Sequence, residues 1–149
     1  MAWKVTGSFD DWERELVKGV REAVKKTADE AVAAAAKRAP KDTTALANSG
    51  YVVTAHESGY EAAKARVQTL NPQAASEMES EFPFDDLEEG IEQAVVDFPV
   101  AYASLIALGF YNPVTKRLVA GRDFLGPSIR SQRHELEKRL SRVLDHLKP

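Results

Sequence analysis

The residues best suited to catalysis or metal binding are few in this chain, and they stand apart from one another. The three histidines are His56, His134 and His146, and no second histidine or cysteine lies at the spacing of a metal-ligand pair. His134 and Glu137 are three residues apart, which would place both on one face of a helix. A single pair cannot complete the coordination shell of zinc. The chain has no cysteine, so disulfides and thiolate chemistry are excluded.

Other signatures of catalysis are missing as well. The eight glycines are scattered along the chain without the spacing of a phosphate-binding or dinucleotide-binding loop. Ser49 and Ser58 lack the strand–turn–helix context of a nucleophile elbow. Because no strong catalytic motif is present, we expect a protein that is not an enzyme and that holds no cofactor and no metal.

Carboxylates gather in one stretch in the middle of the chain, between residues 77 and 92. Calcium would need oxygen ligands at set positions of a loop with a glycine at the bend, and that spacing is absent. We interpret the stretch as an acidic, solvated loop and as a candidate interface. The acidic candidates are Glu77, Glu79, Glu81, Asp85, Asp86, Glu88 and Glu89.

Charge is distributed unevenly along a chain whose formal net charge is only -3. Residues 67–115 contain nine Asp/Glu and no Lys/Arg, whereas residues 116–149 contain nine Lys/Arg and four Asp/Glu. This division favours electrostatic pairing within or between subunits, although solvated surfaces also carry blocks of charge. The basic candidates for an interface are Arg130, Arg133, Arg139 and Arg142.

The basic C-terminal region also raises the alternative of a DNA-binding or regulatory module. Its basic residues are spread around the expected helix, and the pI of the chain is about 5.7. DNA-binding modules usually carry a concentrated basic footprint, and single-strand binding surfaces carry stacking aromatic residues. We expect sequence-independent proximity to double-stranded DNA only if assembled copies surround it.

A long helix is predicted at the N-terminal end of the chain. Apolar residues recur at steps of three and four from Phe9 to Ala35, which is the pattern of a helix with one apolar face. Ser8 is a suitable N-cap, and Pro40 ends the helix because the residue before a proline avoids the α region. About 30 residues would reach about 45 Å. A helix so long is expected to project or to pack against a neighbour.

The middle of the chain has the composition of loops and short strands. Residues 40–50 are predicted to form a loop and residues 51–56 a strand. Residues 61–70 fit the second arm of a hairpin, because apolar and polar residues alternate, and also fit a helix, because Glu, Ala and Lys favour one. Residues 72–90 are predicted to be a long, partly helical loop, and residues 94–98 a third strand.

The last third of the chain returns to helices. Residues 102–108 predict a short helix that Gly109 terminates, and residues 112–121 a turn-rich connection with room for a hairpin. A long terminal helix begins at Asp123 or Pro127. The order of long helix, small antiparallel sheet, short central helix and long C-terminal helix gives the α+β class. We expect a single domain over residues 1–149, with an acidic loop insertion at 71–92.

No segment of the chain has the character of a membrane span or a secretory signal. No run approaches the roughly 18 apolar residues that a span needs, and polar and acidic residues follow Trp3 and Lys4. We therefore expect synthesis in a cytoplasm and no contact with a membrane.

Three segments carry a family resemblance. Residues 36–49, AKRAPKDTTALANS, are similar to the pattern "A..AP.DTG.L..S", and residues 101–109, AYASLIALG, to the pattern "YA..VE.GT". Residues 122–129, RDFLGPSI, are similar to "RPFL.PA" ahead of an amphipathic helix. In this order, they resemble a family of small neck, tail-completion or tail-component proteins of long-tailed bacteriophages. The chain departs from the family pattern at Thr44, Ala107 and Phe110, where the family usually has Gly, an acidic residue and Thr.

The residues that match the family pattern are expected to define the fold through packing and turns more than through contact with a partner. They are Pro40, Asp42, Thr43, Leu46, Tyr102, Gly109, Phe124, Leu125 and Pro127.

The resemblance implies a structural virion protein of the head–tail junction. Such a protein would form a homo-oligomeric ring that joins the head-closure proteins to the tail tube and lets DNA pass. Its partners would be copies of itself and the adjacent head-closure, tail terminator or tail tube proteins. A tail terminator that caps the tube is the alternative within the same class. The acidic stretch would meet basic residues of a neighbour, line the lumen or dock an adjacent ring.

Overall fold

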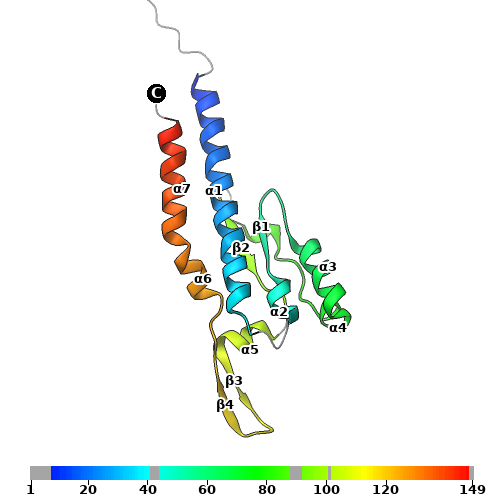
Figure 1. Cartoon of the computed structure of the whole chain (residues 1–149). Helices are drawn as coiled ribbons and strands as arrows, with labels where there is room; N and C mark the ends of the chain where they lie inside the picture. Colours follow the sequence, from blue (N-terminus) through cyan, green and yellow to red (C-terminus); the bar gives the residue numbers. More distant parts are fainter. Residues whose placement is uncertain (1–7, 41–43, 88–91, 101, 148–149) are drawn as a thin grey trace, which may run out of the picture.

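The computed structural model of the chain describes residues 8–40, 44–87, 92–100 and 102–147 (Figure 1). Its helices are α1 (Ser8–Arg38), α2 (Thr44–Ser49), α3 (Tyr60–Leu70), α4 (Pro72–Ser76), the 3-10 helix η1 (Phe84–Asp86), α5 (Ala103–Leu108), α6 (Gly126–Ser131) and α7 (Arg133–His146). Its strands are β1 (Tyr51–Thr54), β2 (Ala94–Asp97), β3 (Gly109–Asn112) and β4 (Arg117–Ala120). The α+β class is confirmed, with long helices towards both ends of the chain.

Helix α1 is the axis of the molecule, and elements from both halves of the chain pack along it (Figure 1). Helix α7 runs antiparallel to its N-terminal half, while α2, α6, β1 and β2 contact it further along. The approach of α7 is close at Gly19, where a Cβ would lie 2.5 Å from Val143 Cγ1. Small buried residues such as Ala28, Ala31 and Ala35 form the face that the other elements cover. The predicted apolar stripe is therefore the buried face of the middle of α1.

The described strands form two separate antiparallel pairs, whereas one small sheet was predicted. Strands β1 and β2 pair with Tyr51 opposite Asp97, and they lie against α1. Strands β3 and β4 form a hairpin that extends beyond the packed body (Figure 1). The first pair belongs to the core, and the second does not.

Residues from distant parts of the chain meet in the main core. Its buried members are Ala35, Ala39, Leu46, Phe98, Val100 and Phe124, and partly buried residues including Tyr102, Ile106 and Leu125 pack around them. The rings of Phe98 and Phe124 meet edge to face at 5.2 Å and 82°, a favoured geometry for aromatic pairs. The three segments that carry the family resemblance therefore contribute to one cluster.

A second cluster lies on the other side of β1, beneath α3. Tyr51, Val53, Tyr60 and Ala63 are buried there, with Met78 and Phe82 packed against them. The Tyr51 hydroxyl donates a hydrogen bond to Asp97 Oδ2 and accepts one from the Phe82 N–H, both at 2.8 Å. Burial, together with the neighbouring Asp97 carboxylate, raises the pKa of Tyr51 well above its usual value. This hydroxyl attaches the stretch before η1 to strand β1.

In the middle of the chain the structure decides one open alternative and corrects one prediction. Residues 61–70 form helix α3 instead of a strand, so the helix alternative holds. The physical reason is burial at helical spacing, since Tyr60, Ala63 and Val67 are buried together on one face. Residues 44–49 form the short helix α2 within the predicted loop, because Ala45, Leu46 and Ser49 turn inward. Residues 41–43, which include Asp42 and Thr43, lie outside the described residues.

The C-terminal helix differs from its prediction in being divided. Helix α6 ends at Ser131, and α7 begins at Arg133. Asp123 Oδ1 accepts a hydrogen bond from the Gly126 N–H at 2.8 Å at the start of α6, and Pro127 occupies its first turn. The break at Gln132 separates a segment anchored in the core from one that lies along α1.

Candidate assembly surfaces

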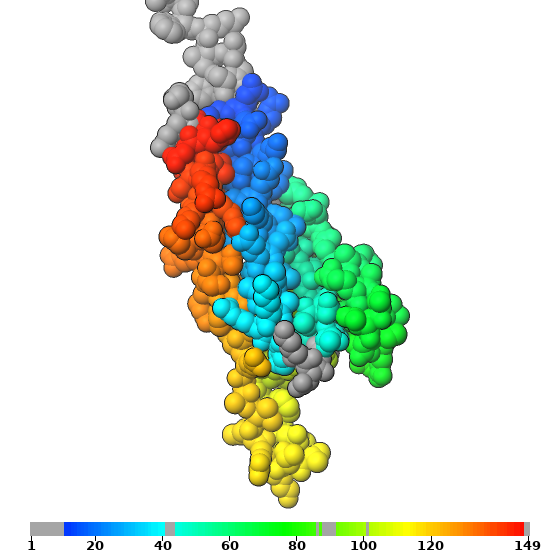
Figure 2. Space-filling model, in the orientation of Figure 1, coloured from blue at the N-terminus to red at the C-terminus, as the bar shows by residue number. Residues whose placement is uncertain are grey.

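The hairpin of β3 and β4, residues 109–120, is called the arm. It projects from the end of the molecule, as both views show (Figures 1 and 2). Tyr111 pairs with Leu118 across the strands, and Phe110 with Val119, so each pair lies on its own face. Tyr111, Val114 and Leu118 are 57%, 88% and 83% exposed. The arm therefore presents large apolar side chains that the described body does not cover.

Backbone contacts around Gly109 and Gly121, here called the root of the arm, fix the direction in which the arm leaves the body. Gly109 has a φ of 87°, and a Cβ there would lie 2.6 Å from the Val119 carbonyl oxygen. Gly121 faces it, because a Cβ there would lie 2.5 Å from the Leu108 carbonyl carbon. The Arg122 N–H donates to the Ile106 carbonyl at 2.7 Å. A side chain at either glycine would force the two chains of the root apart.

The turn of the arm carries positive charge. Asn112 Oδ1 accepts hydrogen bonds from the Val114 and Thr115 N–H groups at 2.9 and 3.3 Å, which shapes the turn. Lys116 and Arg117 follow, and both are exposed. Neither of them forms an ion pair with a residue that the structure describes. The tip therefore combines apolar side chains with two cations that are available to a partner.

Residues 77–87 are called the acidic segment. Glu77, Glu79 and Asp85 are exposed and Glu81 is half-buried. Phe84, the first residue of η1, is 44% exposed. The segment has a defined position, because the Glu79 N–H donates to the Pro99 carbonyl at 2.7 Å. The Phe82 N–H bonded to Tyr51 is a second attachment.

The other acidic candidates divide between residues that the structure describes and residues that it does not. Asp86 is the last residue of η1. Glu88 and Glu89 lie outside the described residues. Glu92, at the end of the acidic stretch, forms an ion pair with Arg21 on α1 at 3.1 Å and lies 3.9 Å from His56 Nε2. Part of the stretch thus pairs with basic residues of its own chain.

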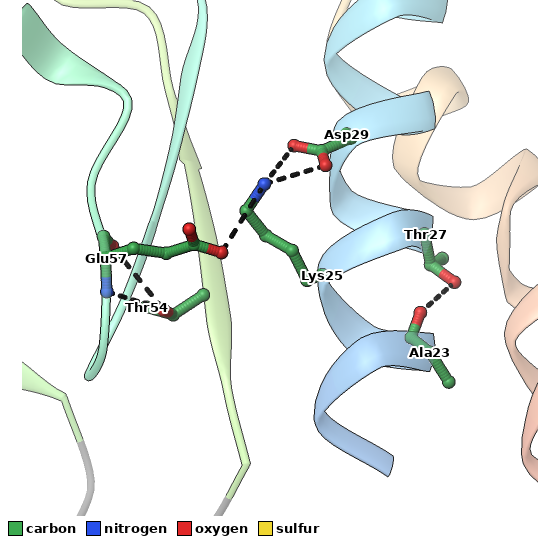
Figure 3. Close-up of polar contacts among 6 residues, drawn as sticks. All are labelled: Ala23, Lys25, Thr27, Asp29, Thr54 and Glu57. Atoms are coloured by element: carbon green, nitrogen blue, oxygen red, sulfur yellow. Dashed lines mark hydrogen bonds and ion pairs between the residues drawn. The ribbon is translucent and has the colours of Figure 1, made fainter. Parts of the chain in front are cut away.

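Arg139 is bound within the subunit. Its Nη1 donates to Thr27 Oγ1 at 2.8 Å and its Nη2 to Glu30 Oε2 at 2.6 Å, and only 12% of its side chain is exposed. The hydrogen bond from Arg139 holds the pKa of Glu30 below its usual value. Thr27 in turn donates to the Ala23 carbonyl at 2.7 Å (Figure 3). This guanidinium joins α7 to α1.

The other three basic candidates are exposed. Arg133 pairs with Glu137 one turn away at 3.3 Å, and Arg130 and Arg142 lie on the surface of α6 and α7. Arg130 and Arg133 line an apolar groove of about 420 Å³ between α1, β2 and α6–α7. Its apolar lining includes Val24, Ala28, Ala31, Val96, Ile129 and Leu136. The four arginines are divided among an internal contact, this groove and open surface.

A smaller hollow of about 240 Å³ lies between α1, β1 and the start of α3. Lys25 Nζ is 2.7 Å from Asp29 and 3.7 Å from Glu57 across it (Figure 3). Arg66 donates to the Gly50 carbonyl at 3.0 Å. The charged groups of this hollow are occupied with one another and with the backbone. They hold α1 against the β1–α3 connection.

Two further features are absent from the parts of the chain that the structure describes. No three His, Cys, Asp or Glu side chains come together there in a way that could hold a metal ion. None of the helices there combines the length and the apolar character that crossing a bilayer requires.

The described residues that match the family pattern lie in the core or at the ends of helices. Leu46, Phe124, Tyr102 and Leu125 belong to the main cluster. The others stand at helix boundaries: Pro40 follows α1, Gly109 follows α5, and Pro127 is in the first turn of α6. The first group is explained by packing in the core, and the second by the need to end or begin a helix at these positions.

Sequence reasoning did not identify the arm as an interface. It predicted room for a hairpin at residues 112–121, but gave its side chains no role. A signal was present, since Tyr111, Val114, Leu118 and Val119 stand within a turn-rich stretch beside Lys116 and Arg117.

No protein-family model, no curated protein and no solved structure matches the chain. Its function is therefore inferred from its own surfaces and from the resemblance of the three segments.

Proposed function

We propose that this protein is a non-enzymatic structural subunit of the head–tail junction of a long-tailed bacteriophage, and that it works by assembling with copies of itself into a ring. The observation that carries the proposal is the arm, a projecting hairpin with exposed apolar side chains. An isolated two-stranded hairpin is at best marginally stable in water. Fully burying a Val or Leu side chain contributes about 1.5–3 kcal/mol. An arm with Tyr111, Val114 and Leu118 in solvent therefore favours a partner that covers it.

Assembly into a ring is supported by the position of the arm. It lies at one end of the molecule (Figure 2), so an arm that docks on the body of a neighbouring copy joins two different surfaces. A contact between two different surfaces is heterologous, and repeated around an axis it closes into a ring when the rotation closes. The adjacent rings would be head-closure, tail terminator or tail tube proteins, and double-stranded DNA would pass through the lumen.

The phage assignment is supported by the three segments of the family resemblance. Leu46, Tyr102 and Phe124 come from three different segments, yet all three belong to one core cluster. A resemblance whose three segments each contribute to one cluster describes a folding unit, which is more specific than three unrelated short matches.

Disruption of the gene in the phage that encodes the chain tests this function. We expect DNA-filled heads and separate tails of normal length by electron microscopy, with joined particles restored by a wild-type copy in trans. A copy carrying Glu61→Gln, an exposed residue of α3, should restore them equally well. Tubes of uncontrolled length would indicate a tail terminator instead. Normal yields of joined, infectious particles without the protein would refute the proposal.

A further inference from the structure

We infer that the arm of one copy docks on the acidic segment of a neighbouring copy, with apolar side chains at the centre and Lys116 and Arg117 facing carboxylates. The inference rests on the proposed function and names the contact that holds the ring together. The arm comprises residues 109–120, and the acidic segment comprises residues 77–87.

The arm supplies an apolar surface with cations beside it. Tyr111 and Leu118 form its more exposed face, and Val114 stands at the turn. Lys116 and Arg117 adjoin this face and form no ion pair with the described residues. A partner that matches the arm must offer apolar area together with carboxylates.

The acidic segment offers that combination. Phe84 is exposed next to Asp85, and Glu77 and Glu79 are exposed further back along the same segment. No Lys or Arg occurs anywhere between residues 67 and 115, so these carboxylates have no cation close in sequence. Among the described side chains, Glu77 accepts a hydrogen bond only from Gln73, at 3.2 Å. The segment is attached at Glu79 and Phe82, so its backbone is already positioned before any contact.

The arm must find its partner on another copy. Its tip stands clear of α3 and of α4, the helix that leads into the acidic segment, in the space-filling view (Figure 2). The same chain thus carries an unmatched basic tip and an unmatched acidic segment at separate places. Opposite charges steer association and suppress wrong docking, so the two surfaces fit one another between copies.

The apolar groove between α1 and α6–α7 is the competing place for the arm. Arg130 and Arg133 line it, and Lys116 and Arg117 would be brought close to them. Like charges brought together across an interface oppose docking. Charge therefore favours the acidic segment over the groove.

Disulfide trapping tests the contact directly, because the natural chain has no cysteine. Purified full-length protein with Val114→Cys is mixed with a size-tagged protein with Asp85→Cys under mild oxidation. We expect a mixed disulfide dimer, and only background with a tagged Glu61→Cys control. Two results would overturn the inference. One is a mixed dimer when the tagged partner carries Ile129→Cys in the groove in place of Asp85→Cys. The other is the absence of any mixed dimer with Asp85→Cys at about millimolar protein, a concentration at which even weak association is populated.

Charge reversal tests the same contact by an independent route. Lys116→Glu with Arg117→Glu should lower the yield of the mixed dimer by about tenfold, since opposing charges then repel. Adding Glu77→Lys and Glu79→Lys to the Asp85→Cys partner should restore it. As a control, Arg130→Glu with Arg133→Glu in the Asp85→Cys partner should leave the yield of the mixed dimer unchanged, because those residues line the groove. Loss of the mixed dimer in this control would count against the inference.

All these charges are exposed, so the melting temperature of each variant should stay near that of the parent. The gene-disruption experiment does not depend on where the arm docks. Separated heads and tails combined with a failed crosslink would therefore reject this contact and leave the proposed function standing.

Discussion

Replacing Phe124 with alanine should remove the side chain that anchors α6 to the rest of the fold. Phe124 is 2% exposed and meets Phe98 edge to face in the main cluster. The same cluster contains Leu46 from α2 and Ala35 from α1. The substitution therefore opens a cavity where three separate segments of the chain converge.

The expected loss follows from the buried ring. A Phe→Ala change in a core lowers the free energy of unfolding by about 3–5 kcal/mol, and an edge-to-face pair accounts for about 0.5–1.5 kcal/mol beyond area burial. Domains of ordinary size are stable by about 5–15 kcal/mol, so the variant should still fold. With a urea m value of about 2 kcal/mol/M, the midpoint should fall by about 1.5–2.5 M.

Urea unfolding followed by far-UV circular dichroism measures this loss. Phe124→Leu keeps most of the volume but loses the ring, so its midpoint should fall less than that of the alanine variant. Val114→Ala is the matched control, because it truncates an apolar side chain that is 88% exposed; it should change the free energy of unfolding by no more than about 0.5 kcal/mol. If Phe124→Ala lowers stability no more than Val114→Ala does, the placement of Phe124 in the core is refuted.

Three further changes test other contacts. The hydrogen bond from Arg139 lowers the pKa of Glu30 in the folded protein. The stabilisation from this contact is therefore present above the unfolded pKa of about 4.3 and is lost as the pH falls through the folded pKa. Urea midpoints from pH 7 to pH 3 should decline less steeply for Glu30→Gln than for the parent, and identical slopes would contradict the contact. Burial raises the pKa of Tyr51, so the stabilisation from its protonated hydroxyl is present below the unfolded pKa of about 10 and is lost as the pH rises through the folded pKa. The tyrosinate absorbance that Tyr51→Phe removes should therefore emerge only at a pH above the unfolded pKa. Its appearance near pH 10 in folded protein would argue against the buried hydroxyl. Gly19→Ala would place a Cβ 2.5 Å from Val143 Cγ1. Overpacking costs about 1–3 kcal/mol and alanine gains about 1 kcal/mol over glycine inside a helix, so the free energy of unfolding should fall by up to about 2 kcal/mol, a loss that adding Val143→Ala should partly relieve. Thermal melts of both variants would show whether α1 and α7 approach as closely as described.

Much of the secondary structure follows from the sequence alone. The apolar periodicity of residues 9–35 predicted α1, and Pro40 predicted its end, because these signals are local and point the same way. The strand at β1, the short helix α5 and its termination at Gly109 were predicted for the same reason. The opposite held at residues 61–70, where alternation and helix propensity disagreed. Packing of Ala63 and Val67 against neighbouring elements decided for the helix.

The candidate surfaces were less predictable. Composition predicted an acidic middle and a basic end, because charge is a property of residue type. It could not distinguish Arg139, which donates to Thr27 and Glu30 across two helices, from Arg130 and Arg142, which stay exposed. That distinction depends on which residues α1 places opposite α7.

Sequence by itself therefore determined the class of the fold, the long helices and the separation of charge, since each depends on residue type or on local periodicity. Tertiary structure alone decided that Leu46, Tyr102 and Phe124 share one core and that the arm stands outside it. Burial and exposure are set by contacts between residues far apart in the chain, and a side chain such as Val114 becomes a candidate for binding only where no such contact covers it.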